Sequence, residues 1–270
     1  MNSATEPVNP TLWQSLRALP KPFWVLCVGT FINRFGTFVF PFLTLYLSAK
    51  GHAPGEVKFA LMAHGLGHLL ACFFGGWLAD RIGRRNTIAA SMFGAAVAML
   101  CLSAARGLPA ISLFAGLTGF AIASYHPASA ALLADIIPPA GRVRAYTVLR
   151  IAINGGWAAG IATAGWLAQH SYTFLFWGDA LTCMIFGVLA LFALPHGLRR
   201  TNVRAPWGEA IASVLSNKPF LAVFAANFCA ALVFCQMSTT LALQVSAAGL
   251  SASFFGQLLA VNGVLIVLLE

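Results

Sequence analysis

The 270-residue sequence predicts an all-α polytopic membrane protein, and its composition and repeated apolar stretches carry that prediction. Hydrophobic residues make up 59% of the chain and charged residues 9%, whereas about half and about a quarter are usual in soluble domains. Stretches of about 18 or more nearly uncharged residues recur, each long enough to cross a bilayer as a helix. We therefore expect a lipid bilayer around the chain. The net charge of +9 does not indicate nucleic-acid binding, because the basic residues are dispersed between apolar stretches.

Six expected membrane spans fill the first part of the chain, and turn or charged residues separate them. They lie at about residues 23–48, 57–78, 87–105, 110–134, 146–168 and 172–194. A seventh span at about 219–247 follows a polar linker, and an eighth apolar segment begins after Ser251 and is still running at Glu270. The six cysteines fall inside these spans without a Cys-x-x-Cys pair, so neither a disulfide framework nor a metal site is predicted.

Basic residues in alternate loops predict the orientation of the chain. One side carries Arg17, Lys21, Arg81, Arg84, Arg85, Arg142, Arg144, Arg199, Arg200, Arg204 and Lys218. The other side carries Lys50, Lys58 and Arg106. Because positively charged loops stay in the cytoplasm, this asymmetry predicts a cytoplasmic N-terminus. The expected location is the cell's inner, or plasma, membrane, which the chain crosses several times.

A short repeat predicts two homologous halves. Lys21-Pro-Phe23 opens the first span and Lys218-Pro-Phe220 opens the seventh, an offset of 197 residues (218 − 21). We expect a complete six-helix bundle over residues 1–194, a cytoplasmic linker over 195–217 and the incomplete start of a second bundle over 218–270. The chain is then expected to be a truncated form of a longer protein; the alternative, a complete chain, ends in an unfinished apolar helix.

The hinge between the second and third spans concentrates charge in an otherwise apolar sequence. Residues 80–85 include Asp80, Arg81, Arg84 and Arg85. Gly83 permits a tight reversal of the backbone there. Arg84 and Arg85 suit the cytoplasmic headgroup region, and Asp80 can accept charged hydrogen bonds from a neighbouring arginine.

This hinge resembles the loop 2–3 motif of the major facilitator superfamily, Gly-x-Leu-Ala-Asp-Arg-x-Gly-Arg-Arg. The matching residues are Gly76, Leu78, Ala79, Asp80, Arg81, Gly83, Arg84 and Arg85. The resemblance implies a secondary transporter of two six-helix halves, similar to the bacterial drug and metabolite exporters of that superfamily. No cofactor is expected. The resemblance also implies that the motif is a gating latch in which Asp80 contacts the second half, near a helix that this chain lacks.

Two other motifs of that superfamily are incomplete here. The fourth span has no arginine between Leu113 and Gly119, where drug–proton antiporters usually carry one. In the fifth span, Gly156-x-x-x-Gly160 remains but the following proline does not. Small residues at that spacing let helices approach closely, so we expect a packing role for them.

Two ionisable residues lie deep in expected spans. Arg34 is 11 residues into the first span, about 16 Å at 1.5 Å per residue, on a polar face with Asn33 and Thr37. That face is expected to line an aqueous cavity. Asp179 is about 10 Å into the sixth span from the opposite side by the same rise. The two depths allow an ion pair, which serves either as a structural lock or as a proton- or substrate-coupled switch.

Further polar residues are expected along the substrate and proton pathway. His64 and His68 share a face of the second span, because they are four residues apart. Interhelical hydrogen bonding or pore lining is favoured for them over a proton relay, and metal binding is not expected. His126, Asn154 and Gln236 are further candidates for the cavity wall.

No catalytic triad, phosphate-binding loop or metal cluster appears, so no enzyme is predicted. The expected function is transport of a small organic solute by a monomer, with efflux coupled to protons or another ion. One alternative is uptake of a small, anionic metabolite, because Arg34 is buried. The other is a membrane sensor or assembly partner that transports nothing. A large extramembrane domain would indicate this class.

Overall fold

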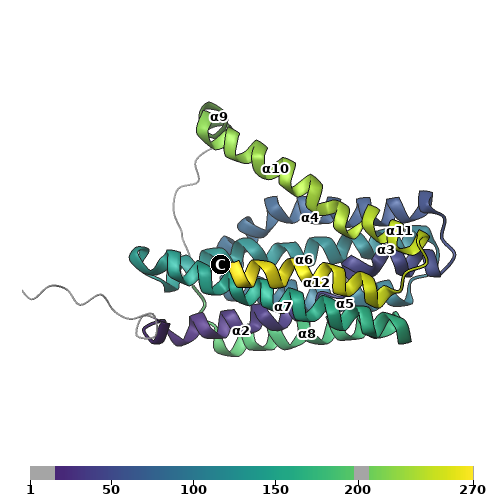
Figure 1. Ribbon diagram of the computed structural model, residues 1–270. Coiled ribbons are helices and arrows are strands. Elements are labelled where there is room, and N and C mark those ends of the chain that lie inside the picture. Colours follow the sequence, from purple (N-terminus) through teal and green to yellow (C-terminus); the bar gives the residue numbers. More distant parts are fainter. Residues whose placement is uncertain (1–15, 198–206, 270) are drawn as a thin grey trace, which may run out of the picture.

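A bundle of long antiparallel helices forms the body of the protein, as the computed structural model shows (Figure 1). The model describes residues 16–197 and 207–269. In these ranges the secondary structure is helical, so the predicted all-α membrane fold is confirmed. The helices up to residue 193 are α2 (Lys21–Phe35), α3 (Val39–Ala49), α4 (Pro54–Ile82), α5 (Arg84–Ala104), α6 (Leu108–Ile136), the short 3-10 helix η1 (Pro139–Gly141), α7 (Arg142–His170) and α8 (Thr173–Ala193). The later ones are α9 (Trp207–Ser216), α10 (Lys218–Ser238), α11 (Thr240–Ala247) and α12 (Ala252–Leu269).

Seven helical stretches in the described ranges are long and apolar enough to cross a membrane. Together with the composition they make the protein a multi-pass membrane protein. The expected fifth span forms the 29-residue helix α7, which is long enough to cross but is not among the seven. Its glycines and three arginines make it less apolar than the others.

The first and seventh spans are each interrupted, which the sequence did not predict. Gly36 ends α2, and α3 begins only at Val39. A Cβ at Gly36 would overlap the side chain of Thr182 on α8, so the close packing of α8 requires glycine at this break. In the seventh span, Thr239 separates α10 from α11.

Glycines bring several helix pairs into backbone contact. A Cβ at Gly156 on α7 would lie 2.7 Å from the carbonyl oxygen of Phe31 on α2, and Gly160 meets the backbone of Phe35 in the same way. The predicted packing role of this glycine pair is therefore confirmed. Further along α7, Gly165 packs against Gly256 of α12, where the Cβ–Cα approach would be 3.1 Å. Helix α12, near the end of the chain, thus packs along α7 (Figure 1).

The region expected as a cytoplasmic linker contains a helix. Residues 207–216 of the 195–217 stretch form α9, which leads into α10. The linker arginines Arg199, Arg200 and Arg204 lie outside the described residues. The division into two halves stays a prediction, and the repeat beginning at Lys218 coincides with the first residue of α10.

The contact between α4 and α6 gives the first testable prediction. A Cβ at Gly67 would lie 2.8 Å from the backbone nitrogen of Phe120, whereas Gly65 on the same helix faces open space. Gly67→Val is therefore expected to separate the helices and destabilise the protein by about 1–3 kcal/mol or more. Thermal unfolding of the purified protein in detergent measures the effect. Gly65→Val is the matched control, and equal melting temperatures for the two variants would contradict the packing described here.

Candidate functional site

The charged hinge is a one-residue connection between two helices. Helix α4 ends at Ile82 and α5 begins at Arg84, so Gly83 alone joins them. Gly83 has φ +91°, a conformation that L side chains rarely adopt. The tight reversal predicted at this glycine is confirmed.

The two following arginines tie the hinge to other helices of the same half. Arg84 is buried and forms an ion pair with Asp135 near the end of α6. The guanidinium of Arg85 contacts Nε2 of His196, just after α8, at 2.6 Å. Sequence reasoning missed Asp135 and His196 as partners. The only feature of the sequence that could have identified these two partners is their position at span ends on the same side as the hinge.

The first charges of the motif lie at its surface. Asp80 is exposed at the end of α4, and no partner for it is found among residues 16–197 and 207–269. The guanidinium of Arg81 lies 5.0 Å from the ring centroid of Trp77, one turn earlier. Gly76 faces open space. The latch between Asp80 and the second half stays a prediction.

A polar cluster forms where side chains of α2, α4 and α6 come together; Arg34 and His126 are half-buried and His68 is exposed. The Arg34 guanidinium on α2 is 3.0 Å from Nε2 of His126 on α6. The ring of His68 on α4 is 6.4 Å from that of His126. The guanidinium of Arg34 also lies 5.8 Å from the ring centroid of Tyr125. The structure thus brings together three residues that the sequence proposed separately for the pathway.

His64 lies at the edge of this cluster and is buried. Its ring stacks on Phe40 at 4.2 Å between centroids, and its Nε2 atom is buried without a hydrogen-bond partner in the described part of the chain. His64 and His68 project from the same helix, as predicted from their spacing. No group of three His, Cys, Asp or Glu side chains within the described ranges can hold a metal ion.

Asp179 is buried on α8 and binds the break in the first span. One carboxylate oxygen accepts hydrogen bonds from the backbone N–H groups of Phe38 and Val39, each at 3.2 Å. Its other oxygen lies 3.8 Å from Sγ of Cys183. Asp179 therefore caps the start of α3, where no side chain of the helix itself caps it.

The ion pair considered between Arg34 and Asp179 is not among the contacts of the described residues. Arg34 contacts His126, while Asp179 binds backbone amides. The physical reason is the interruption of the first span. The break removes the N–H groups of Phe38 and Val39 from the regular hydrogen-bond pattern of a helix, so both can donate to Asp179, and the Phe38 N–H also donates to the backbone oxygen of Gly36 at 2.7 Å.

The remaining predicted residues lie in different surroundings. Asn33 is 3% exposed, and its amide nitrogen approaches the sulfur atoms of Met92 and Cys183 at 3.5 and 3.3 Å, so it packs between helices and not on a cavity wall. Thr37 donates a hydrogen bond to the backbone oxygen of Asn33 at 3.1 Å. Asn154 donates to the backbone oxygen of Arg150 at 2.9 Å and lines a cavity of about 240 Å³ together with Arg34. Gln236 is exposed on α10.

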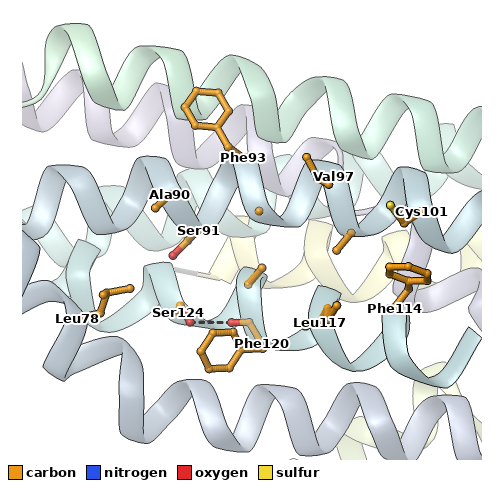
Figure 2. A pocket seen from close by; sticks show the side chains of 13 residues that line it. Leu78, Ala90, Ser91, Phe93, Val97, Cys101, Phe114, Leu117, Phe120 and Ser124 are labelled. Atoms are coloured by element: carbon orange, nitrogen blue, oxygen red, sulfur yellow. Dashed lines mark hydrogen bonds between the residues drawn. The ribbon is translucent and has the colours of Figure 1, made fainter. Parts of the chain in front are cut away.

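The largest of the described cavities lies away from this cluster. It has a volume of about 520 Å³ and lies between α5 and α6, with Leu78 of α4 at one end (Figure 2). Its lining is almost entirely apolar. Ser124, one of its few polar residues, donates its hydroxyl proton to the backbone oxygen of Phe120 at 2.7 Å, so this hydroxyl is occupied within its own helix. None of the predicted pathway residues lines it.

Comparison with known proteins identifies the family. The family model described as Major Facilitator Superfamily matches residues 26–269. The chain is 28% identical over 259 residues to an uncharacterized MFS-type transporter, YttB, of Bacillus subtilis, covering 93% of the chain and 64% of that protein. It is 28% identical over 211 residues to the multidrug resistance protein MdtH of Yersinia enterocolitica, covering 76% of the chain and 51% of that protein.

Solved structures show the same fold. A bacterial homologue of the human lysosomal transporter Spinster, in an inward-facing and unoccupied conformation, superposes with a TM-score of 0.62 at 17% identity, covering 87% of this chain and 57% of that one. A peptide transporter POT mutant in complex with sulfate gives 0.58 at 19% identity, covering 84% and 48%. The chain thus spans about half to two thirds of the length of the relatives it matches.

Proposed function

Because the chain belongs to the major facilitator superfamily, we propose that the whole protein is a secondary active transporter of a small organic solute. It works by alternating access, in which two six-helix halves rock about a central site. The observation that carries this proposal is the cluster of Arg34, His68 and His126 on three membrane-spanning stretches, far from the ends of these stretches. Ionisable groups at membrane depth are costly and are retained where they serve a solute or proton pathway.

The proposed direction is efflux. Its support is the relative named as a multidrug resistance protein, MdtH. Uptake of an anionic solute is the second candidate, and one observation favours it. Arg34 lies inside the bundle beside a histidine, and it forms no ion pair within the described ranges.

The proposed coupling ion is the proton, and Asp179 is its proposed carrier. This buried carboxylate binds the amides of Phe38, just before α3, and of Val39, the first residue of α3. A carboxylate accepts such hydrogen bonds more strongly than a protonated carboxyl group does. Uptake of a proton at Asp179 would therefore weaken the cap and change the geometry of the break between α2 and α3, which lies beside Arg34.

The hinge motif is the proposed gate. Gly83, Arg84 and Arg85 fix one end of the first half, and Asp80 is left to contact the second half. The N-terminus is proposed to lie in the cytoplasm and the protein in the inner, or plasma, membrane, which the positive loops support. We propose a monomer, since each chain of this design holds its own central site.

Counterflow exchange tests transport without requiring a gradient. The full-length protein is reconstituted in liposomes loaded with one unlabelled solute, and entry of the same solute in radiolabelled form is followed, over a panel of organic anions, neutral solutes and cations. Saturable exchange of at least one solute, absent from protein-free liposomes, is expected. A lack of exchange across the whole panel would contradict the transport function.

A further inference from the structure

A small cavity lies where the two halves of the protein meet. It has a volume of about 240 Å³ and is lined from α2 by Arg34, from α7 by Asn154 and Trp157, from α10 by Phe234 and from α12 by Asn262. Two isoleucines complete its wall. Polar and apolar side chains therefore face the same space, as in sites that bind small organic molecules.

Two hydrogen-bond donors of this wall are buried and have no acceptor in the described part of the chain. They are Nε of Arg34 and Nε1 of Trp157. Buried donors in native proteins are nearly always paired, so two of them on one cavity wall require an explanation. An indole N–H and a guanidinium N–H can only donate, so a partner for them must be an acceptor.

The positive charge on the cavity wall indicates which chemical class of acceptor fits there. A guanidinium stays protonated in proteins, and no Asp or Glu lines the cavity beside Arg34. The carboxylate of Asp179 is held by the amides of Phe38 and Val39. The other contacts of Arg34, with His126 and Tyr125, bring no full negative charge. An arginine inside a membrane bundle is stabilised most by an anion, and its guanidinium matches carboxylate and phosphate oxygens.

We propose that the transported solute carries an oxyanion, a carboxylate or a phosphate, that accepts hydrogen bonds from Arg34 and Trp157. The amide side chains of Asn154 and Asn262, from opposite halves, complete the polar side of the site. Phe234 and the isoleucines pack against the carbon skeleton of the solute. This inference rests on the proposed transport function and assigns the substrate class that the central site takes.

The test is ligand-induced stabilisation of the purified full-length protein, which needs no gradient and no transport. The probes share two carbon skeletons and differ in the head group. They are benzoate, phenyl phosphate, benzamide and benzylamine, and butyrate, butyl phosphate, butyramide and butylamine. At least one oxyanion is expected to raise the melting temperature saturably, while its amide and amine do not. Comparing the carboxylate with the phosphate of that skeleton then identifies the preferred oxyanion.

Variants separate this site from non-specific anion binding. Arg34→Gln is expected to weaken the apparent affinity for the oxyanion roughly 10- to 100-fold, the loss that follows removal of a charge-assisted hydrogen bond. Trp157→Phe keeps an aromatic ring, removes the indole N–H donor and is expected to weaken the affinity for the oxyanion less than Arg34→Gln does. This second variant keeps the inference testable if Arg34→Gln does not fold. Arg144→Gln, at an exposed position of α7, is the matched control and is expected to leave the affinity unchanged.

Three results of the stabilisation assay would overturn the inference. They are no stabilisation by any oxyanion, equal stabilisation by the matched amide or amine, and equal affinity of Arg34→Gln and the unmodified protein. Counterflow of a neutral or cationic solute that Arg34→Gln leaves intact would overturn it as well, while the transport function would stand. Oxyanion binding without exchange of any solute would support the site and contradict transport.

Discussion

Arg84→Ala is expected to destabilise the solubilised protein by about 3 kcal/mol, the cost of breaking a mostly buried ion pair from one side. Arg84 is 6% exposed, and its partner Asp135 is itself partly buried at the end of α6. Without the guanidinium, the carboxylate keeps its desolvation cost and loses its counter-charge. The measurement is thermal unfolding in detergent, and expression level is followed in parallel.

Two further variants show whether the loss of stability comes from the ion pair between Arg84 and Asp135. Arg81→Ala, which removes an exposed arginine of the same hinge, is expected to change stability by well under about 1 kcal/mol. In a double-mutant cycle, Asp135→Asn introduced into Arg84→Ala is expected to recover part of the lost stability. Strict additivity of the two substitutions would contradict a direct ion pair.

Asp179→Ala is expected to destabilise the protein by about 1.5–3 kcal/mol for each charged hydrogen bond lost. The Val39 N–H would stay buried in the bundle without the acceptor that now caps α3, and the Phe38 N–H would keep only the backbone oxygen of Gly36. Asp179→Asn keeps an acceptor oxygen but does not titrate. It is therefore expected to fold and to exchange solute by counterflow, while transport driven by a proton gradient falls at least tenfold, about 1.4 kcal/mol.

Glu56→Gln is the matched control for that variant. Glu56 lies in the first turn of α4, where its carboxylate is 2.9 Å from Nδ1 of His52, outside the polar cluster. Its neutralisation is expected to leave gradient-driven transport intact. Loss of folded protein in Asp179→Asn would identify the carboxylate as a structural cap, and unchanged gradient-driven transport would remove Asp179 from the proton pathway.

The features that the sequence predicted well are those fixed by local chemistry. The reversal at Gly83 follows from a charged turn between two apolar stretches, and glycine alone suits its positive φ. The contact of Gly156 and Gly160 with α2 follows from small residues one turn apart. The membrane spans follow from hydropathy, since a bilayer admits few other structures.

The features that the sequence did not predict depend on which helix faces lie opposite one another in the fold. Depth alone made Arg34 and Asp179 possible partners, but the break after Gly36 supplied backbone amides for Asp179. Asn33 was expected to share the polar face of Arg34, yet consecutive side chains on an α-helix point about 100° apart. Its amide consequently packs among sulfur atoms of α5 and α8.

The cavity between Arg34 and Asn262 was predicted only in part. Arg34 and Asn154 were expected on its wall, whereas Trp157 and Asn262 were not. A tryptophan in an apolar span gives no signal of an unpaired indole N–H, because that depends on the helix opposite it. Asn262 lies in the last segment, whose packing on α7 was not visible in its sequence.

Transport under an imposed proton gradient tests the central claim most directly. The full-length protein is reconstituted in liposomes with a pH difference across the membrane, and movement of the solute identified by counterflow is followed with and without a protonophore. Accumulation against the solute gradient is expected, which the protonophore abolishes and which Asp179→Asn lacks. Accumulation that is independent of the pH difference, or an Asp179→Asn variant that still accumulates the solute, would contradict it.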